Sequence, residues 1–354
     1  MKKKICVIFG GESTEYEVSL RSAYSVIEKL DKDKFDVITI GIRKDGKWFL
    51  YDGDYKNIPE DKWYGEKLLP VSLLHGSKES SIVSLKPDGT YEKLIFDVAF
   101  PVLHGKNGED GTIQGLFELA GIKYVGVGVI ASSVGMDKTF TKIIFKNAGI
   151  PQADWVTIAK HELNELDLKI EEIEKKLGYP AFIKPANAGS SIGIGKAKNR
   201  DELIECINEA FKFDRKVLVE EFLTGHEVEC AVLGNKGNIK ASCVGEIVAS
   251  QEFYTYDAKY SSDSTSELYI PAKLEEKYSE MVRGYAIKAF EALDGKGLSR
   301  VDFFVDEEKE KVCINEINTM PGFTSISMYP KLFEASGIEY TELLTKLIEI
   351  AQEE

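Results

Sequence analysis

The chain has 354 residues, of which 43% are hydrophobic and 29% are charged, and its formal net charge at pH 7 is −14. This length allows two or three domains with a well-buried core, whereas so negative a charge argues against a nucleic-acid partner, which needs a basic face. Five cysteines without a CxxC pair argue against a disulfide or zinc framework. The first apolar run ends at Phe9 and no stretch nears the ~20 apolar residues of a membrane span, so we expect a cytoplasmic protein without a membrane partner.

The first segment, residues 1–130, is predicted to be an α/β domain, because buried apolar runs alternate with helical patterns. Strands are expected over residues 4–9, 35–42, 48–51 and 96–101, and helices over residues 18–30 and 113–120. Residues 44–47 have the sequence KDGK, which is typical of a hairpin turn between two of these strands. A polar, glycine-rich loop is expected over residues 104–112.

Two further segments, residues 131–222 and 223–354, continue the mixture of helices and strands. In the second segment, helices are expected over residues 139–147, 162–177 and 201–210, and strands over residues 181–184, 192–196 and 216–222. In the third, strands are expected over residues 227–233, 239–246, 298–305 and 311–317, and helices over residues 274–293 and 341–352. The polar stretch between residues 247 and 270 is too long for an ordinary connection, so we interpret it as a lid or a disordered segment.

The stretch AFIKPANAGSSIGIGK, residues 181–196, has the glycines of a phosphate-binding loop. It is not a P-loop, because Ser190 stands where the first glycine belongs and Ala197 replaces the hydroxyl residue. Lys184 precedes the loop and Lys138 begins a predicted helix. Each lysine alone is most simply a surface charge, but as a pair facing the loop they are suited to binding phosphate oxygens.

The predicted hairpin formed by residues 298–305 and 311–317 carries a candidate metal site. Residues two apart on a strand share a face, so Glu316 and Asn318 should point the same way. With the turn near Lys309, Asp302 should lie opposite Glu316, which brings together the hard oxygen ligands that magnesium prefers. The alternative is a solvated hairpin face, but carboxylates in otherwise apolar strands need compensation, which favours the metal.

The order of motifs along the chain resembles the ATP-grasp ligases, and in particular the D-alanine–D-alanine ligase family. The motifs are GGESTEYEVSL (10–20), PVLHGKNGEDGTIQG (101–115), MDK (136–138), FIKPANAGSSIG (182–193), VLVEEFLTGHEVECAVLG (217–234), SRVDFF (299–304) and NEINTMPGFTSIS (315–327). This resemblance implies an α/β (α+β ATP-grasp) fold. Residues 1–130 would form the N-terminal α/β domain. Residues 131–222, with the glycine-rich loop, and 223–354, with the lid and metal site, would clamp ATP between their sheets.

The resemblance also implies a set of site residues. Those for ATP are Lys138, Lys184, Gly189, Ser190 and Ser191 at the phosphates, Glu220, Glu221, Phe222 and Leu223 at the adenine, and Glu227 at the ribose. Those for two Mg²⁺ ions, with Mn²⁺ as a substitute, are Asp302, Glu316 and Asn318. Glu15 and His104 would bind the ammonium side of the first D-alanine. The second D-alanine would be surrounded by Arg300, the Gly322 amide, Ser327 and Met328. Ser190 and Tyr260 would link to Glu15 and close the site beneath a lid carrying Lys259 and Tyr260.

The implied activity is ATP-dependent joining of two D-alanines through D-alanyl phosphate for peptidoglycan synthesis, with Arg300 and the Gly322 amide stabilising the oxyanion. The family is commonly dimeric through its N-terminal domain, so we expect a homodimer. Simpler interpretations exist for single residues: Glu15 as a helix-start carboxylate, His104 as a structural loop residue, Arg300 in a surface ion pair, and Tyr260 in loop packing.

Three rival functions remain open. A D-alanine–D-serine or D-alanine–D-lactate ligase would use the same scaffold, whereas relatives of those types tend to carry Arg at the position of Met328, and the lactate makers a His at that of Tyr260. Both residues therefore favour D-alanine, although FPVLHGKNGEDGT, residues 100–112, resembles the serine branch. Residues 324–327 read TSIS where the family often has TSHS, so a second histidine contact is absent. A non-catalytic ATP-binding protein would not need the oxyanion donor Arg300.

Overall fold

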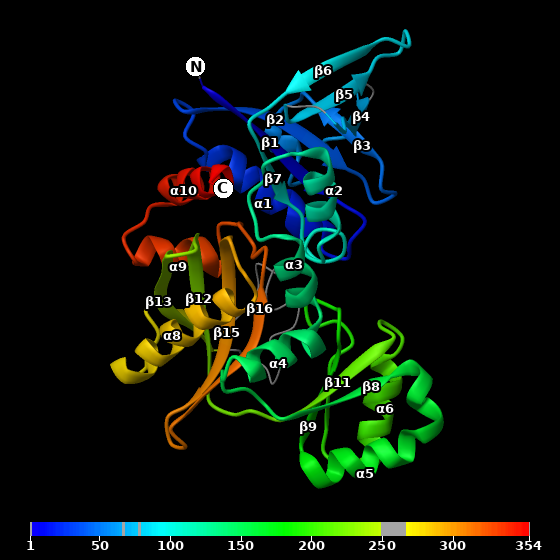
Figure 1. Ribbon diagram of the computed structural model, residues 1–354, viewed down its shortest axis with the longest axis vertical. Coiled ribbons are helices and arrows are strands. Elements are labelled where there is room, and N and C mark those ends of the chain that lie inside the picture. The colour runs from blue at the N-terminus through cyan, green and yellow to red at the C-terminus, as the bar shows by residue number, and fades with distance from the viewer. Residues whose placement is uncertain (1, 66–67, 77–78, 249–266, 354) are drawn as a thin grey trace.

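Three β-sheets, each formed by strands that are consecutive in the sequence, organise the chain (Figure 1). The computed structural model describes residues 2–65, 68–76, 79–248 and 267–353. Each sheet falls within one of the three predicted segments, whose boundaries stay a prediction. No helix in the described ranges combines the length and the apolar character needed to cross a bilayer.

The N-terminal sheet has seven strands in the order β6-β5-β4-β3-β2-β1-β7. β1 (Lys3–Gly10) pairs in parallel with β2 (Phe35–Ile42) and with β7 (Val98–Val102). The interior of β1 is fully buried, as expected for a parallel strand covered on both faces. The remaining elements are α1 (Tyr16–Lys29), β3 (Trp48–Tyr51), η1 (Tyr55–Asn57), β4 (Leu69–Leu73), β5 (Ser81–Leu85), β6 (Tyr91–Ile95), α2 (Thr112–Ala120) and α3 (Val129–Met136). η1, α3 and the antiparallel strands β4 to β6 are not among the predicted elements.

The second sheet is antiparallel, in the order β10-β9-β11-β8. Its elements are α4 (Lys138–Asn147), β8 (Trp155–Ala159), η2 (Lys160–Glu165), α5 (Leu166–Lys176), β9 (Ala181–Pro185), β10 (Gly195–Ala197), α6 (Arg200–Ala210) and β11 (Lys216–Glu221). The strand predicted over residues 192–196 was placed too early. Ser190, Ser191 and Gly193 have positive φ angles, which an extended strand does not accommodate. The helix predicted from residue 162 is likewise wrong over its first turn, which is a 3₁₀ segment.

The third sheet has five antiparallel strands in the order β14-β13-β12-β15-β16. Its elements are β12 (His226–Asn235), β13 (Asn238–Val248), β14 (Glu267–Tyr269), α8 (Glu276–Ala292), β15 (Gly297–Asp306), β16 (Lys311–Asn318), α9 (Met328–Ala335) and α10 (Tyr340–Gln352). The predicted strands and both predicted helices are confirmed within a few residues, whereas α9 was missed. Of the predicted lid, residues 249–266 lie outside the described part, and Glu267 begins β14.

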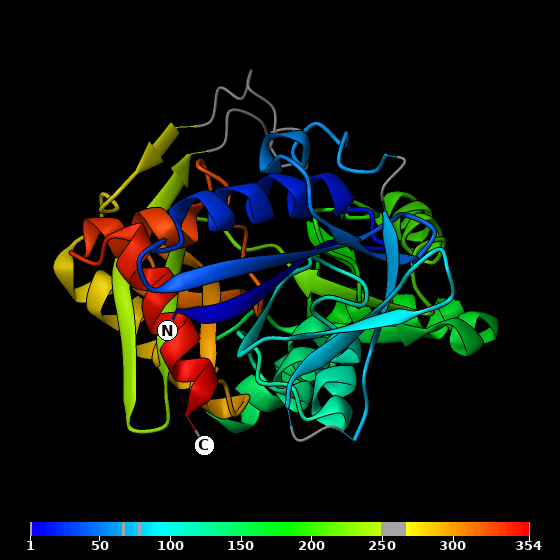
Figure 2. The ribbon, with the colours of Figure 1, turned by 90° about the horizontal axis from the view of Figure 1, so that it is seen from above.

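One hydrophobic cluster joins the first sheet to the C-terminal end of the chain, and this contact positions the site. Phe9 and Phe100 belong to the same buried cluster as Phe323, Tyr329 and Leu347. The rings of Phe100 and Phe323 pack edge to face with centroids 5.8 Å apart, an arrangement worth ~1 kcal/mol beyond area burial. Helices α1 and α10 are also packed together (Figure 2). The loops after β1, β7 and β16 are therefore held at one junction.

Candidate active site

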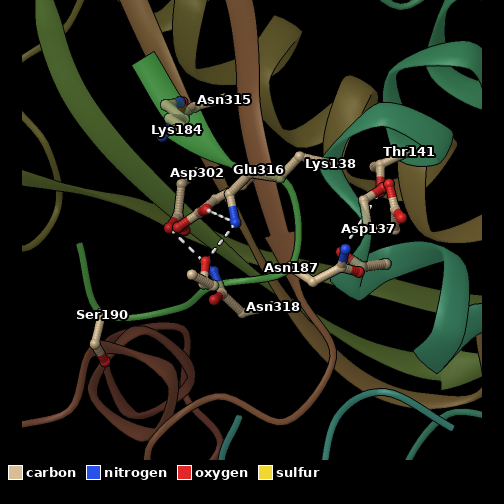
Figure 3. A network of polar contacts seen from close by, with 12 residues as sticks. Asp137, Lys138, Thr141, Lys184, Asn187, Ser190, Asp302, Asn315, Glu316 and Asn318 are labelled. Carbon is tan, nitrogen blue, oxygen red and sulfur yellow. Dashed lines mark hydrogen bonds and ion pairs between the residues drawn. The ribbon is translucent and has the colours of Figure 1, made fainter. Parts of the chain in front are cut away.

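The hairpin of β15 and β16 brings the three predicted metal ligands together (Figure 3). Asp302 is the register partner of Glu316, which confirms the predicted pairing. Asn318 donates its Nδ2 hydrogen to Asp302 Oδ2 at 3.1 Å. The register shifts after Asp302, and the bulge re-aims Asn315, whose Oδ1 accepts from Lys184 Nζ at 2.8 Å. Two carboxylates and an amide thus face one point, although the described ranges hold no group of three or more His, Cys, Asp or Glu side chains placed to bind a metal ion.

Arg300 lies at the centre of a buried ion network beside this hairpin. Its guanidinium donates from Nε to Asp302 Oδ1 and from Nη2 to Asp302 Oδ2, each at 2.7 Å. Nε also lies 2.9 Å from Glu229 Oε2. Only 15% of the Arg300 side chain is exposed, so the interpretation as a surface ion pair is wrong. Glu229 was missed, although strand alternation puts it on the same face as Glu227.

The two predicted phosphate lysines converge on the glycine-rich loop and the hairpin (Figure 3). Lys138 begins α4, where Asp137 accepts hydrogen bonds from the helix start. Lys138 Nζ donates to the Ala188 carbonyl at 2.8 Å and lies 3.8 Å from Glu316 Oε2. Lys184 reaches the hairpin from β9. Both lysines line the same space beside the loop.

Glu220 forms a buried ion triad with Lys184 and Lys142. Its Oε2 lies 2.7 Å from Lys184 Nζ and its Oε1 lies 2.5 Å from Lys142 Nζ. Burial alone would raise the pKa of Glu220, but the two lysines outweigh burial and lower it to about 2. The carboxylate is engaged by these cations, so any adenine contact from this residue falls to its backbone. Lys142 was missed; its signal was its place four residues after Lys138 on the same helix face.

Glu15 meets the glycine-rich loop from the N-terminal segment. Ser190 Oγ donates a hydrogen bond to Glu15 Oε1 at 2.5 Å, which is the predicted link between the loop and the α1 start. Ser190 holds a φ of +51° to make this contact, a conformation that a residue with a Cβ adopts only at some energetic cost. The other predicted partners, Lys259 and Tyr260, lie outside the described residues.

His104 does not have the free ring nitrogen that a direct contact with the substrate ammonium requires. Its Nδ1 lies 3.0 Å from the Met320 carbonyl and its Nε2 lies 3.1 Å from Ser22 Oγ. Burial lowers the pKa of His104 despite the neighbouring charge of Glu15. A neutral, fully bonded imidazole of this kind matches the simpler interpretation, a structural histidine, and the assignment of His104 to the first D-alanine stays a prediction.

Glu109 is a second carboxyl group near Glu15 that the sequence analysis missed. Its Oε1 accepts from the Gly105 amide at 2.8 Å and its Oε2 accepts from the Met320 amide at 3.3 Å. Burial, and then the charge of Glu15, raise the pKa of Glu109 to about 8. Its position in the polar loop GKNGED gave no signal that it would face inward.

Two adjoining cavities contain almost the whole predicted site. The first is lined by Glu15, His104, Arg300, Asn318, Gly322, Ser327 and Met328. The second is lined by Ser191, Glu221, Phe222, Leu223, Glu227 and Asp302. Both are lined by Lys138, Lys184, Gly189, Ser190, Glu220 and Glu316. Apart from Glu220, which was predicted at the adenine, the shared residues are those predicted for phosphate and metal, so the two cavities meet where a phosphoryl group would be transferred.

Comparison with known proteins identifies the family. The model of the D-Ala-D-Ala ligase N-terminus matches residues 4–127, and that of the D-Ala-D-Ala ligase C-terminus matches residues 144–349. The chain belongs to the D-alanine–D-alanine ligase family. Its three-sheet, mixed α/β architecture is accordingly the ATP-grasp fold of these enzymes.

Relatives with that name cover the chain from end to end. A D-alanine–D-alanine ligase of Acetivibrio thermocellus is 55% identical over 99% of this chain and 96% of its own. Among solved structures, the VanG D-Ala:D-Ser ligase from Enterococcus faecalis is 40% identical with a TM-score of 0.90, and covers 99% of this chain and 100% of its own. The D-alanine–D-alanine ligase from Coxiella burnetii is 35% identical with a TM-score of 0.84, and covers 99% of this chain and 94% of its own.

Proposed function

We propose that the protein is a cytoplasmic, ATP-dependent ligase that joins two D-alanines into D-alanyl-D-alanine for peptidoglycan synthesis. The observation that carries this proposal is the shared wall of the two cavities. Lys138, Lys184 and Glu316 belong to both cavities, so a nucleotide on one side can pass its phosphoryl group to a substrate on the other. A protein that only bound ATP would have no need for the first cavity, the acceptor cavity, which is lined by the buried Arg300.

The nucleotide belongs in the cavity lined by Phe222, Leu223 and Glu227. Its phosphates would then lie against Lys138 and Lys184, beneath the glycine-rich loop, with the loop amides as further donors.

The donor set of the hairpin fits magnesium, because Asp302, Glu316 and Asn318 supply hard oxygens. These residues would hold two ions, which cancel phosphate charge when bound. Asp302 Oδ1 accepts one hydrogen bond from Arg300 and has a second lone pair for a cation, whereas Oδ2 accepts from both Arg300 and Asn318.

In the first step, the carboxylate of the first D-alanine attacks the γ-phosphorus of ATP. A carboxyl–phosphate bond forms, the bond between the γ-phosphorus and the bridging oxygen breaks, and ADP leaves. The protein's part is positioning, because phosphoryl transfer depends on alignment and charge neutralisation. Glu15 would hold the substrate ammonium, while Ser190 keeps the loop against Glu15.

In the second step, the neutral amine of the second D-alanine attacks the acyl carbon of D-alanyl phosphate. A tetrahedral oxyanion forms, and its collapse with loss of phosphate and of one proton from the amine nitrogen leaves the peptide bond. Arg300 and the Gly322 amide are the donors that would stabilise this oxyanion, and loss of one such donor typically costs about 2.7–4 kcal/mol. Ser327 and Met328 line the same cavity and would contact the second substrate.

A D-alanine–D-serine ligase is the second candidate, because the VanG structure is similar over the whole chain. D-alanine is favoured as the second substrate by Met328, which is buried in the acceptor cavity and offers an apolar wall instead of a hydrogen-bonding partner. A site that hydrogen-bonds the hydroxyl of D-serine would discriminate strongly against D-alanine, which lacks it. An apolar wall discriminates only weakly against the added hydroxyl of D-serine.

Phosphate release from ATP tests the proposal directly. Release should depend on D-alanine and should be matched by one dipeptide per phosphate. A rate of phosphate release that does not depend on D-alanine would contradict the ligase assignment. Competition among D-alanine, D-serine and D-lactate in the same assay decides the second substrate. We also propose a homodimer formed through residues 1–130, which analytical ultracentrifugation of the full chain tests.

A further inference from the structure

The turn that carries Gly322 is held on both sides by residues of the N-terminal segment. Glu109 accepts a hydrogen bond from the Met320 amide at 3.3 Å. His104 Nδ1 lies 3.0 Å from the Met320 carbonyl. Ser22 Oγ accepts from the Phe323 amide at 3.2 Å. Gly322 thus lies between two residues whose backbone groups are fixed by the first sheet's loop and by α1.

The directions of these hydrogen bonds are determined by chemistry. A carbonyl oxygen can only accept, so the Nδ1 of His104 carries the hydrogen that points to Met320. In a neutral imidazole Nε2 then accepts, so Ser22 donates its hydroxyl hydrogen to His104 while accepting from Phe323. The result is one directional chain that runs from the Phe323 amide back to the Met320 carbonyl. The lowered pKa of His104, caused by burial, preserves the neutral form that this chain requires.

Glu109 completes the arrangement on the opposite side of the Met320 residue. Its two oxygens accept from two different amides, Gly105 within its own loop and Met320 across the junction. An amide side chain offers only one acceptor oxygen, and an aspartate is one methylene shorter. The loop is braced behind Glu109 by Gln114, whose Nε2 donates to the Gly108 carbonyl at 2.8 Å. Glu109 is therefore a rigid support.

We propose that Glu109 and His104 are positioning residues that aim the Gly322 amide at the oxyanion of the second step. This inference rests on the proposed ligation, in which Gly322 serves acyl transfer and has no part in phosphoryl transfer. Loosening the turn should therefore slow dipeptide formation and spare the formation of ADP and acyl phosphate. A displacement of about 1 Å in a catalytic group can cost ~100-fold in rate.

The test is a single-turnover experiment on Glu109→Gln in the full-length protein, with ADP and dipeptide measured in the same quenched samples. We expect ADP formation within ~3-fold of wild type and dipeptide formation slower by ~10- to 100-fold. Asp110→Asn is the matched control, because Asp110 is the neighbouring carboxylate but, within the described residues, accepts from the amides of Asn107 and Thr112 and not from Met320. Its two rates should change together.

His104 supplies an independent variant if Glu109→Gln folds poorly. His104→Asn keeps an N–H near the Met320 carbonyl, so it should retain more dipeptide formation than His104→Ala at equal ADP formation. Equal loss of both products in Glu109→Gln, with an unchanged melting temperature, would overturn the positioning role, as would wild-type rates of dipeptide formation in both His104 variants. Failure of the proposed ligase function would give a different result from failure of the positioning role: the wild-type protein itself would form ADP without D-alanine.

Discussion

The guanidinium of Arg300 donates two hydrogen bonds of 2.7 Å to the carboxylate of Asp302, one to each oxygen. The residue proposed to stabilise the oxyanion and a residue proposed to bind magnesium are therefore one rigid unit. Glu229 Oε2 lies 2.9 Å from Nε of the same guanidinium and adds a second negative charge beside it. Such a bidentate pair orients both groups more strictly than a single contact would.

Replacing Arg300 should affect turnover far more than nucleotide binding. In Arg300→Lys one ammonium cannot reproduce the fork to Asp302 and Glu229, so we expect kcat for dipeptide formation to fall by at least ~100-fold. The Kd for ATP, measured by calorimetry, should change much less. Arg300→Ala should act in the same direction, but it also leaves two buried carboxylates without their cation. Equal losses of turnover and affinity would contradict the assigned role.

Gly105 should not tolerate alanine, because a side chain there would clash with Glu15. This clash adds to the strain from its positive φ angle. A Cβ at Gly105 would lie 2.4 Å from Glu15 Oε2, whereas a Cβ at Gly121 meets nothing within 4 Å. Both glycines have nearly the same φ, +69° and +68°, so alanine strains both backbones equally. We expect Gly105→Ala to raise KM for the first D-alanine by ~10-fold or more, as loss of a charged hydrogen bond would.

Gly121→Ala is the control for that measurement. It should lower the melting temperature as much as Gly105→Ala does and leave KM for the first D-alanine near the wild-type value. Similar KM values in the two variants would argue that Glu15 does not hold this substrate.

Strands and the pairing of their residues could be predicted from the sequence where burial produces a recognisable pattern of apolar residues. β15 and β16 are apolar strands interrupted by Asp302 and Glu316, so both the hairpin and the pairing of the carboxylates could be predicted. β6 could not, because most of its residues are exposed and it leaves no alternation to detect. Its strand character comes from pairing with β5, a contact that the local sequence does not encode.

Contacts with partners that are distant in the sequence could not be predicted. His104 has the residue type of a substrate ligand, but its ring nitrogens are engaged by Ser22 and Met320, from the start and the end of the chain. Lys142 shares a helix face with Lys138, but nothing in the local sequence of α4 indicated that it would contact Glu220. The residue types were readable, whereas the direction of each side chain depends on tertiary packing.

The buried triad of Glu220, Lys142 and Lys184 should make stability depend on acid pH. The folded-state pKa of Glu220, about 2, lies below its ordinary value of 4.5. A carboxyl with a lowered pKa stabilises the fold fully above its unfolded pKa, and this stability is lost as pH falls through the folded pKa. The relevant window is therefore pH 4.5 to about 2. The contribution is on the order of 3 kcal/mol.

Lys142→Met should reduce that dependence, because Glu220 would keep only one of its two cations. Urea unfolding at pH 7 and pH 3.5 should give a smaller difference for Lys142→Met than for wild type. Lys146→Met is the matched control, since Lys146 shares the contact with the Trp155 ring but has no ion pair with Glu220. If the stability difference between pH 7 and pH 3.5 were reduced equally in both variants, the triad would not be its cause.

Removing one carboxylate from the hairpin should raise the requirement for divalent ions. In Glu316→Gln the oxygen that remains is neutral, so we expect the Mg²⁺ concentration for half-maximal dipeptide synthesis to rise by ~10-fold or more. Asp306→Asn makes the same charge change on β15, but Asp306 binds Lys309 and Thr224 away from both cavities. Its Mg²⁺ requirement should match wild type. Titration of the rate with Mg²⁺ and with Mn²⁺ makes the comparison, and an unchanged requirement in Glu316→Gln would exclude this carboxylate as a ligand.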